Sequence, residues 1–317
     1  MIVVLTGGTG GAKFIDGLQH VVPPEDLTVI VNTGDDHDWW GLRVSPDIDS
    51  ITYVLAGKLS NERGWGVRGD TFHCLQTMKE LGEPHWFSVG DRDLATHLLR
   101  TKLLSEGQTL SEATRTISDR FGLRSRILPM SDQPIETRIE TPDGEISFEE
   151  YFVQRRYQDQ VNSVRFAGAR DAKPAPGVLD AIAGAEAVLI APSNPVTSIG
   201  PILAVPGIRE ALRATSAPVV AVSPIIENAA VSGPAAALMK AQGLEASIAG
   251  VAGAYGDFLD VLVAHDCDSA AAEAIRSDRL HVHCANILMR TSEDKTRIAQ
   301  TALQVAASPP ARLAEAK

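Results

Sequence analysis

The sequence predicts an α/β protein with a Rossmann-like parallel sheet, helices on both faces of that sheet, and a small inserted α+β subdomain. Short runs of β-forming residues recur along the chain, and most lead through a polar or glycine-rich loop into an apolar pattern of helical period. Residues 2–31 read strand, helix, strand, which is the βαβ unit of parallel sheets. Residues 124–165 instead contain a hairpin pattern around Pro142-Asp143-Gly144. We therefore expect one domain over residues 1–317, with the subdomain inserted at about 124–165.

Composition excludes several classes of protein. The chain has 317 residues, 44% of them hydrophobic and 22% charged, as in ordinary globular proteins. A net charge of −11 argues against non-specific binding to nucleic acid or to an anionic membrane. Cys74, Cys267 and Cys284 form neither a disulfide framework nor a zinc motif. The chain opens on a strand rather than a leader and has no apolar run of membrane-spanning length, so we expect a cytoplasmic protein.

The first strand, at residues 2–5, continues into the glycine-rich stretch 6–12 and a helix predicted at 13–18. Glycines let the backbone approach an anion, and a helix start presents free N–H groups and a positive dipole end. No Gly-Lys-Ser/Thr closes the stretch as in a P-loop, and Lys13 stands where the third glycine of the dinucleotide fingerprint belongs. The stretch is either a phosphate cradle or a tight strand-to-helix turn.

Acidic residues follow the second strand, which is predicted at residues 27–31. Asn32, Asp35 and Asp36 come at its carboxyl end, where open α/β sheets bind ligands, and they suit a ribose hydroxyl or a solvated acidic loop. Asp47 and Asp49 precede a helical pattern at 51–55. Helix capping explains one of these two carboxylates, whereas the D-x-D spacing also suits a hard cation.

The next segment predicts three helices and one strand. The first helix ends at Leu81 and has Asp70 and Thr71 as its cap, and a strand follows at 86–89. The second helix, at 94–104, is capped by residues 90–93, and the third, at 109–121, is capped by Ser111. Arg92, between two aspartates, is either a neutralised surface charge or a guanidinium aimed at an anion or a planar ring. We interpret His97 as structural.

The parallel pattern resumes after the insertion. Further strands are predicted at 187–190, 219–222, 248–252, 262–265 and 281–284, followed by a helix from about Ser292 and a frayed tail at 308–317. The first two strands lead into loops 191–201 and 223–234, which are rich in proline, small hydroxyl residues and amides. Turn chemistry explains either loop alone. Together with the glycine stretch, a shared phosphate and nucleotide pocket explains them better, and Ser193, Asn194, Thr197 and Ser198 offer donors and acceptors to it.

Several long motifs occur in one order along nearly the whole chain. They include T-G-G-T-G-G-A-K at 6–13, V-N-T-G-D-D at 31–36, S-P-D-I-D-S at 45–50, G-D-R-D-L-A-T-H at 90–97 and P-S-N-P-V-T-S-I-G-P at 192–201. With these motifs the sequence resembles the 2-phospho-L-lactate transferase family of coenzyme F-420 biosynthesis, which includes the CofD and FbiA proteins.

The resemblance implies a phosphoryl transfer. The donor would be a three-carbon acid linked through diphosphate to guanosine, and the acceptor would be the ribityl hydroxyl of the deazaflavin Fo (7,8-didemethyl-8-hydroxy-5-deazariboflavin). The enzyme would transfer the phospho-acid unit from donor to acceptor and release GMP, with Mg²⁺ as cofactor. The acid is lactate, enolpyruvate or glycerate, and the resemblance also implies a homodimer.

The resemblance also implies roles for individual residues. Asp49 and Arg92 correspond to residues that hold Fo, and Asp47 and Asp49 become the catalytic candidates, either as magnesium ligands or in orienting the attacking hydroxyl. The residues expected to bind the donor's nucleotide and phosphates are Thr6, Gly7, Gly8, Thr9, Gly10, Gly11, Lys13, Asn32, Asp35, Ser193, Asn194, Thr197, Ser198, Ser223, Ser232 and Gly233.

Two other functions fit parts of this pattern. YvcK-like proteins resemble the N-terminal half, but they bind a nucleotide sugar and act as regulators, and the D-x-D and G-D-R-D motifs favour the transferase. A NAD-dependent oxidoreductase would rest only on the βαβ start, lacks the third glycine and shows no hydride-transfer partner.

Overall fold

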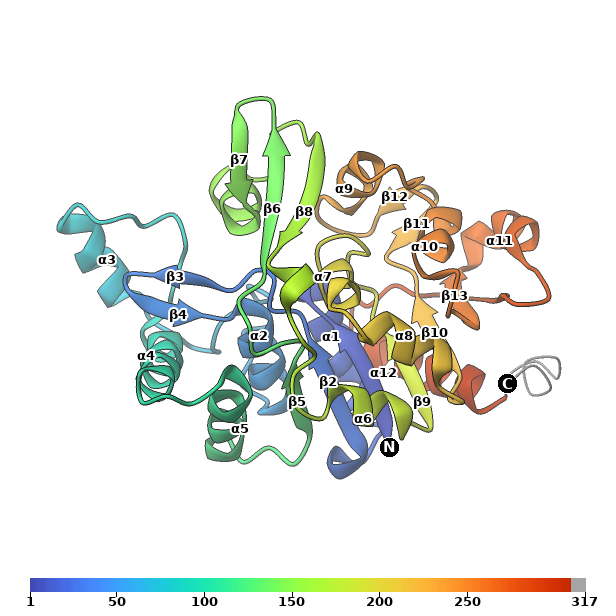
Figure 1. Ribbon diagram of the computed structural model, residues 1–317, viewed down its shortest axis with the longest axis horizontal. Helices are drawn as coiled ribbons and strands as arrows, with labels where there is room; N and C mark the ends of the chain where they lie inside the picture. The colour runs from blue at the N-terminus through green and yellow to red at the C-terminus, as the bar shows by residue number, and fades with distance from the viewer. Residues whose placement is uncertain (309–317) are drawn as a thin grey trace.

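Seven parallel strands form the centre of the structure, a computed structural model that describes residues 1–308 (Figure 1). Their order across the sheet is β14-β13-β10-β9-β1-β2-β5. Their bounds are β1 Ile2–Thr6, β2 Leu27–Val31, β5 Arg126–Pro129, β9 Ala187–Ile190, β10 Val219–Val222, β13 Val261–His265 and β14 His281–Ala285. Every pairing is parallel, which confirms the predicted α/β class. The predicted tail at 308–317 lies, from residue 309 onward, outside the described residues.

Helices cover both faces of this sheet, because successive strand residues point to opposite sides. Val4 faces a core shared with α1 Gly8–Leu18, α2 Pro46–Leu55 and α12 Ser292–Ala307. Val3 and Leu5 face a second core on the other side. The helices of that side are α6 Val178–Ala183, α7 Gly200–Ala204, α8 Ile208–Ala214, α9 Ala235–Ala241, α10 Ile248–Tyr255 and α11 Ser269–Ile275.

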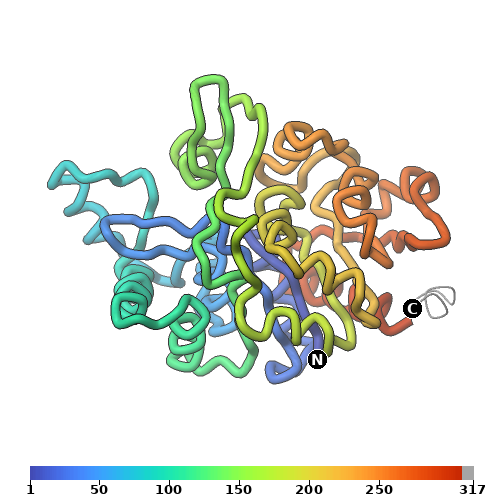
Figure 2. The backbone as a smooth tube through the Cα atoms, viewed as in Figure 1, coloured from blue at the N-terminus to red at the C-terminus, as the bar shows by residue number. Residues whose placement is uncertain are grey.

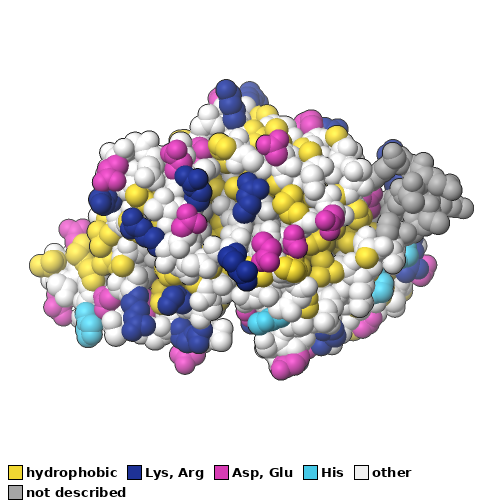
Figure 3. Space-filling view, turned by 90° about the horizontal axis from the view of Figure 1, so that it is seen from below, with side chains coloured by type: hydrophobic (Ala, Val, Ile, Leu, Met, Phe, Trp, Pro, Cys, Tyr) yellow, Lys and Arg dark blue, Asp and Glu magenta, His cyan; other side chains and the backbone are white. Residues whose placement is uncertain are grey.

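A lobe beyond β5 carries three helices and a hairpin, at the left of Figure 1. Its elements are β3 His37–Trp39, β4 Leu42–Val44, α3 His73–Glu80, α4 Asp91–Ser105 and α5 Leu110–Arg120. Trp39, Val44 and Val89 form its small aromatic-lined core, whereas α3 buries none of its residues. Hydrophobic side chains gather toward this end of the molecule in Figure 3. Leu81, the C-cap residue of α3, is 72% exposed. Within residues 1–308, no helix combines the length and the apolar character that a membrane crossing requires.

A three-stranded antiparallel sheet stands above the carboxyl ends of the central strands, and Figure 2 follows the chain into it and back. It has the order β7-β6-β8, with β6 Glu136–Thr141, β7 Gly144–Ser147, the π-helix η2 Glu150–Gln154 and β8 Ser163–Ala167. The β6–β7 turn matches the predicted hairpin. Because β5 pairs with β2 in the central sheet, the antiparallel segment begins at β6 rather than at residue 124. We refer to β6 through β8 as the insertion.

The remaining elements are short. They are β11 Ile225–Ile226, β12 Ala229–Ala230 and the 3-10 turns η1 Pro24–Asp26, η3 Ala169–Asp171 and η4 Asp266–Asp268.

Three predicted elements differ from the structure. Helix α1 begins at Gly8, so the glycines predicted as a turn form its first residues. Residues 248–252 belong to helix α10, not to a strand, because the Ser247 side chain caps the segment by accepting from the Gly250 N–H at 3.2 Å. Residues 86–89 form no strand and pack as loop against the lobe's aromatic core.

The caps of α3 and α4 are exchanged relative to the prediction. Asp70 accepts from the N–H groups of Arg92 and Asp93 at the start of α4, at 2.8 and 3.0 Å. Asp91 accepts from the N–H groups that begin α3, including that of Cys74 at 2.9 Å. Helix α5 is capped by Thr109 rather than Ser111, in a capping box with Glu112.

Candidate functional site

The glycine loop packs at the carboxyl ends of β1 and β2, directly against α2. Gly7 is the N-cap of α1, and the Gly8 N–H donates to Asp47 Oδ1 at 2.6 Å. A Cβ at Gly7 would lie 2.7 Å from Asp47 Oδ2 and 3.0 Å from Ser198 Cβ, so only glycine fits there. The loop therefore joins α2 to the loop that follows β9.

Asn32 connects the acidic residues at this edge. Its side-chain nitrogen lies 2.9 Å from Asp35 Oδ2, 2.9 Å from Asp47 Oδ2 and 3.3 Å from the carbonyl of Thr197. Its side-chain oxygen accepts from the Gly34 N–H at 2.8 Å. Because one amide nitrogen binds both carboxylates, Asp35 and Asp47 are held as neighbours with fixed orientation.

Asp35, Asp36, Asp47 and Glu149 form the acidic cluster, in which every residue is at least nine-tenths buried. Burial raises the pKa of Asp47 to about 6 and the pKa of Asp36 to about 7. Burial, then the charges of Asp47 and Asp36, raise the pKa of Glu149 to about 8. Burial, then the charges of Asp47 and Glu149, also raise the pKa of Asp35. Four carboxyl groups thus share a space that disfavours their ionisation together.

The protein compensates little of this negative charge. Asp36 accepts from the Ser45 hydroxyl at 2.6 Å and lies 3.8 Å from Arg43, the one cationic side chain that the described residues place in an ion pair with the cluster. Asp36 Oδ1 is buried without a hydrogen-bond partner, and the Thr137 side chain is the group that lowers the pKa of Asp35 against the rise caused by burial. Carboxylate oxygens are the ligands that a hard divalent cation prefers, so Asp35 and Asp47, which the Asn32 side chain holds as neighbours, are the pair in this cluster that fits Mg²⁺.

Solvent reaches the cluster from the α4–α5 side. A cavity of about 230 Å³ opens beside Asp36 and is lined also by Thr33, Arg43, Gln108 and Asp132. The buried hydroxyl of Thr33 and the side-chain oxygen of Gln108 have no protein partner. Polar atoms of this kind are typically satisfied by water.

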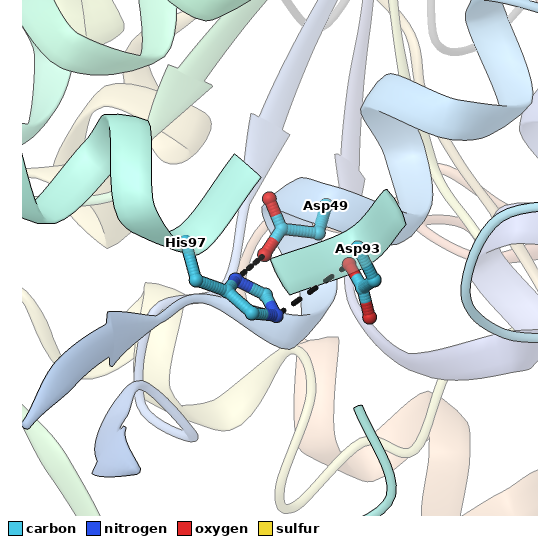
Figure 4. Close-up of side chains that lie close together, drawn as sticks. All are labelled: Asp49, Asp93 and His97. Atoms are coloured by element: carbon cyan, nitrogen blue, oxygen red, sulfur yellow. Dashed lines mark ion pairs between the residues drawn. The ribbon is translucent and has the colours of Figure 1, made fainter. Parts of the chain in front are cut away.

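Asp49 belongs to a different network, although it lies only two positions from Asp47. Both of its oxygens accept from the guanidinium of Arg100, which is completely buried. His97 lies between two carboxylates, with Nδ1 3.4 Å from Asp49 Oδ2 and Nε2 3.5 Å from Asp93 Oδ1 (Figure 4). Tyr53 donates to Asp93 at 2.7 Å. Burial disfavours the Arg100 charge, but Asp49 outweighs burial and the pKa of Arg100 is raised.

The three side chains Asp49, Asp93 and His97 also have the spacing of a metal site, since one ligand atom from each lies within 4.8 Å of the others. Arg100, however, already supplies the positive charge that Asp49 requires. The pairing of Asp47 and Asp49 on one ion stays a prediction, and in this structure the two carboxylates have different partners: Asn32 and the Gly8 N–H bind Asp47, and Arg100 binds Asp49. Asp47 shares its surroundings with Asp35 instead.

Asp49 and Arg92, the two residues predicted to hold Fo, lie in different surroundings. The Asp49 side chain is buried against Arg100, whereas Arg92 is exposed at the start of α4 and donates to the carbonyl of Arg68 at 3.3 Å. The structure does not bring their side chains into contact.

Many of the predicted donor residues meet at the glycine loop. The Ser193 hydroxyl donates to the Gly7 carbonyl at 2.7 Å, and a Cβ at Gly11 would clash with the hydroxyls of Thr6 and Ser193. Buried hydroxyls of Thr6 and Thr197 have no partner. The residues that converge are Thr6, Gly7, Gly8, Gly11, Asn32, Asp35, Ser193, Thr197 and Ser198.

Other predicted donor residues have local structural partners or face solvent. Asn194 accepts from the Val196 N–H of its own loop, and Ser223 exchanges hydrogen bonds with Ile225. Gly10 packs against the Pro192 carbonyl, where a Cβ would lie at 2.4 Å. The remaining residues, all exposed, are Thr9, Lys13, Ser232 and Gly233.

Two residues of the site, Glu149 and Arg100, are not distinguished by the sequence pattern. Glu149 follows the predicted hairpin turn at 142–144, and Arg100 lies mid-helix among apolar and charged residues of α4. No local pattern distinguishes either from a surface charge, because only the folded chain buries them.

A parallel sheet with polar residues gathered at the carboxyl ends of β1, β2 and β9 defines the class of Rossmann-like α/β proteins that bind ligands at that edge. Two solved structures of a UPF0052 family protein from Bacillus halodurans share this fold, and one covers 95% of this chain and 98% of its own at a TM-score of 0.63 and 17% identity. The family profile described as 2-phospho-L-lactate transferase CofD matches residues 2–308, and the chain belongs to this family.

Relatives carry two kinds of name. A 2-phospho-L-lactate transferase from Methanosarcina mazei is 43% identical over 96% of this chain and 99% of its own length. A phosphoenolpyruvate transferase from Streptomyces avermitilis is 44% identical over 96% and 98%. The chain is accordingly a CofD-type transferase, an enzyme that acts on small-molecule substrates.

Proposed function

We propose that the protein transfers a phospho-lactyl or phosphoenolpyruvyl unit from a guanosine-diphosphate-linked donor to the ribityl hydroxyl of Fo, with release of GMP. The observation that carries the proposal is Asn32, whose amide holds Asp35 and Asp47 together directly beside the glycine loop. The free N–H groups at a helix N-terminus bind the negatively charged diphosphate. The paired carboxylates would bind the cation that neutralises the diphosphate charge.

The donor's diphosphate would lie against the start of α1. The unpartnered hydroxyls of Thr6 and Thr197 are available there as donors to phosphate oxygens. In the transfer, the acceptor hydroxyl forms a bond to the phosphorus that carries the three-carbon acid. The bond from that phosphorus to the bridging oxygen breaks, GMP leaves with the electron pair, and the hydroxyl proton is released.

Mg²⁺ is the proposed cofactor, with Asp35 and Asp47 as its protein ligands. When bound, it would supply neutralising charge to the diphosphate. Asn32 would keep the two carboxylates aligned, and Gly8 would hold Asp47 through its N–H.

For the acceptor, we propose that Arg92 contacts the deazaflavin, because its guanidinium is exposed and suits a planar ring or an anion. For Asp49 we propose that it helps to hold Fo while it remains paired with Arg100, whose charge it balances. A homodimer is a further proposal, which sedimentation equilibrium would test.

One experiment tests the proposed function directly. The purified protein is incubated with Fo, Mg²⁺ and each donor in turn, carrying lactate, enolpyruvate or glycerate, and the products are identified by mass. We expect one donor to give the phosphodiester of Fo together with GMP. Absence of transfer from every donor, with tight binding of a nucleotide sugar instead, would favour the regulatory YvcK-like function.

A further inference from the structure

Trp65 and Phe72 lie outside the hydrophobic cores that the described residues form. Both residues are half-buried, and their rings meet edge to face with centroids 6.4 Å apart. The Arg63 guanidinium lies over both rings, 5.6 Å from the Trp65 centroid and 4.9 Å from the Phe72 centroid. We refer to these three residues as the aromatic platform. Large rings stabilise a fold chiefly by packing into a core, so two rings held by a cation outside any core indicate a different use.

The platform lies in the loop between α2 and α3, which backbone hydrogen bonds hold in place. Leu59 and Val67 pair as an isolated antiparallel bridge across this loop. The residue before Phe72 is joined to the start of α4, because the Asp91 N–H donates to the Thr71 carbonyl at 2.8 Å. A ligand that binds rings fixed in this way loses little free energy to ordering them.

Two guanidinium groups meet at this loop. Arg63 and Arg92 donate to consecutive carbonyls, those of Val67 and Arg68, each at 3.3 Å. Within residues 1–308, neither Arg63 nor Arg92 takes part in an ion pair. Their positive charge is thus available to a ligand that brings electronegative atoms or a planar ring.

Open space lies beside the Trp65 backbone. Glycines flank Trp65, with φ angles of 74° at Gly64 and 67° at Gly66. Among the described atoms, a Cβ at Gly64 would meet none within 4 Å, and a Cβ at Gly66 would meet only Asp93 Oδ2, at 4.0 Å. Asp93 belongs to the buried network of Asp49 (Figure 4). The loop with Trp65 therefore borders this network and leaves room beside it.

We propose that the aromatic platform binds the planar ring system of the acceptor, with Trp65 stacked on the ring and Arg92 at its edge. The proposal rests on the proposed function, from which it takes the deazaflavin as acceptor. A deazaflavin ring system is flat and carries carbonyl oxygens at its edge. Aromatic faces and guanidinium donors are complementary to such a ligand.

Isothermal titration calorimetry of the full chain with Fo tests the proposal. Trp65→Leu keeps an apolar side chain but removes the aromatic face, so we expect the Kd for Fo to rise by about tenfold, as for a lost base–aromatic stack. Trp65→Phe keeps a ring and should retain most of the affinity. Tyr157→Leu is the matched control, because it removes a ring that is 44% exposed on the insertion, and it should bind Fo as the wild type does.

Donor binding separates a lost platform from a damaged fold. GDP with Mg²⁺ should raise the melting temperature of Trp65→Leu as much as that of the wild type, because no platform residue belongs to the proposed donor site. In the transfer assay, the KM for Fo should rise while the KM for the donor stays unchanged. If Trp65→Leu does not fold, Phe72→Leu provides the same comparison on the second ring.

The outcomes distinguish this inference from the proposed function. Wild-type affinity for Fo in Trp65→Leu and Phe72→Leu would overturn the role of the platform and leave the proposed transfer standing. Equal weakening by Tyr157→Leu would also overturn it, since the loss would then not be specific to the platform. No binding of Fo by the wild type would overturn the proposed acceptor together with the platform.

Discussion

Arg100 and Asp49 form a buried ion pair whose two members depend on each other. Arg100 is completely buried and Asp49 is 3% exposed, and the guanidinium binds both carboxylate oxygens. Removing either partner leaves the other charge uncompensated in a site that water does not reach. Asp49 therefore contributes to stability, whatever its role toward the acceptor.

We predict that Asp49→Ala and Arg100→Leu each lower the free energy of unfolding by about 3–5 kcal/mol. The double variant should lose less than the sum of the two, because no unpaired charge remains. Urea denaturation of the four proteins measures this coupling. The exposed pair Arg165 and Glu145 is the control, and its alanine variants should cost about 1 kcal/mol or less. If the losses of unfolding free energy at Asp49 and Arg100 were fully additive, the prediction would be contradicted. A loss of transfer activity in Asp49→Ala shows a role toward the acceptor only if the variant is still folded at the assay temperature.

We predict that the raised pKa of Glu149 makes the free energy of unfolding of the cation-free protein depend on pH. Its pKa rises from an ordinary 4.5 to about 8 on folding. Between these values the folded state holds a proton that the unfolded state has released, so the free energy of unfolding falls as pH rises, by up to about 1.4 kcal/mol per pH unit. Below pH 4.5 the contribution is complete, and it is lost as pH rises through about 8.

Urea denaturation in excess chelator at pH 5, 6.5 and 8 measures this slope. Glu149→Gln carries no titrating proton there and should show a flatter decline than the wild type. The slope that remains in that variant comes from Asp35, Asp36 and Asp47, whose pKa values burial also raises, those of Asp36 and Asp47 to about 7 and 6. Equal slopes in the two proteins would contradict the assigned burial of Glu149.

At the scale of the element, the glycines of α1 determine how closely that helix approaches its neighbours. A Cβ at Gly10 would lie 2.4 Å from the Pro192 carbonyl, which is backbone and cannot rotate away. We predict that Gly10→Ala lowers the free energy of unfolding by about 1–3 kcal/mol, because the loop after β9 must shift. Gly253→Ala is the matched control: this exposed helical glycine has no neighbour within 4 Å, so alanine should be neutral or stabilising by up to about 1 kcal/mol. Thermal or urea unfolding compares them, and equal effects would refute the packing argument.

A helix or strand is predictable from the sequence where the local residue pattern agrees with the packing of that segment in the fold. The strand Leu27–Val31 is apolar except for Thr28 and has the bounds that the sequence predicts, because a strand buried on both faces needs such a run. The segment Ile248–Ala252 is equally apolar but folds as a helix, since Ser247 caps it. The caps of α3 and α4 were not predictable, because Asp70 and Asp91 each serve the other helix across about twenty residues.

At the scale of the whole molecule, the site is assembled from segments distant in sequence. The glycine loop, Asn32 and Ser193 were predictable as ligand-binding residues, because each follows a strand of a parallel sheet. Their mutual contacts follow from the strand order, in which β9 pairs with β1 and β1 with β2. The separation of Asp47 from Asp49 was not predictable, since it depends on Arg100 approaching one side of α2 and Asn32 the other.

Because loops from both halves of the chain build the proposed donor site, nucleotide binding should stabilise the whole molecule. We predict that GDP with Mg²⁺ raises the melting temperature, since a ligand that binds only the folded state adds about 2.7 kcal/mol at a hundred times its dissociation constant. NAD should have no such effect, because Lys13 stands in place of the third fingerprint glycine. Ser198→Ala, at the glycine loop, should reduce the GDP shift, whereas Ser105→Ala, exposed at the end of α4, should retain it. A shift with a uridine nucleotide sugar and none with GDP would assign the site to a different ligand.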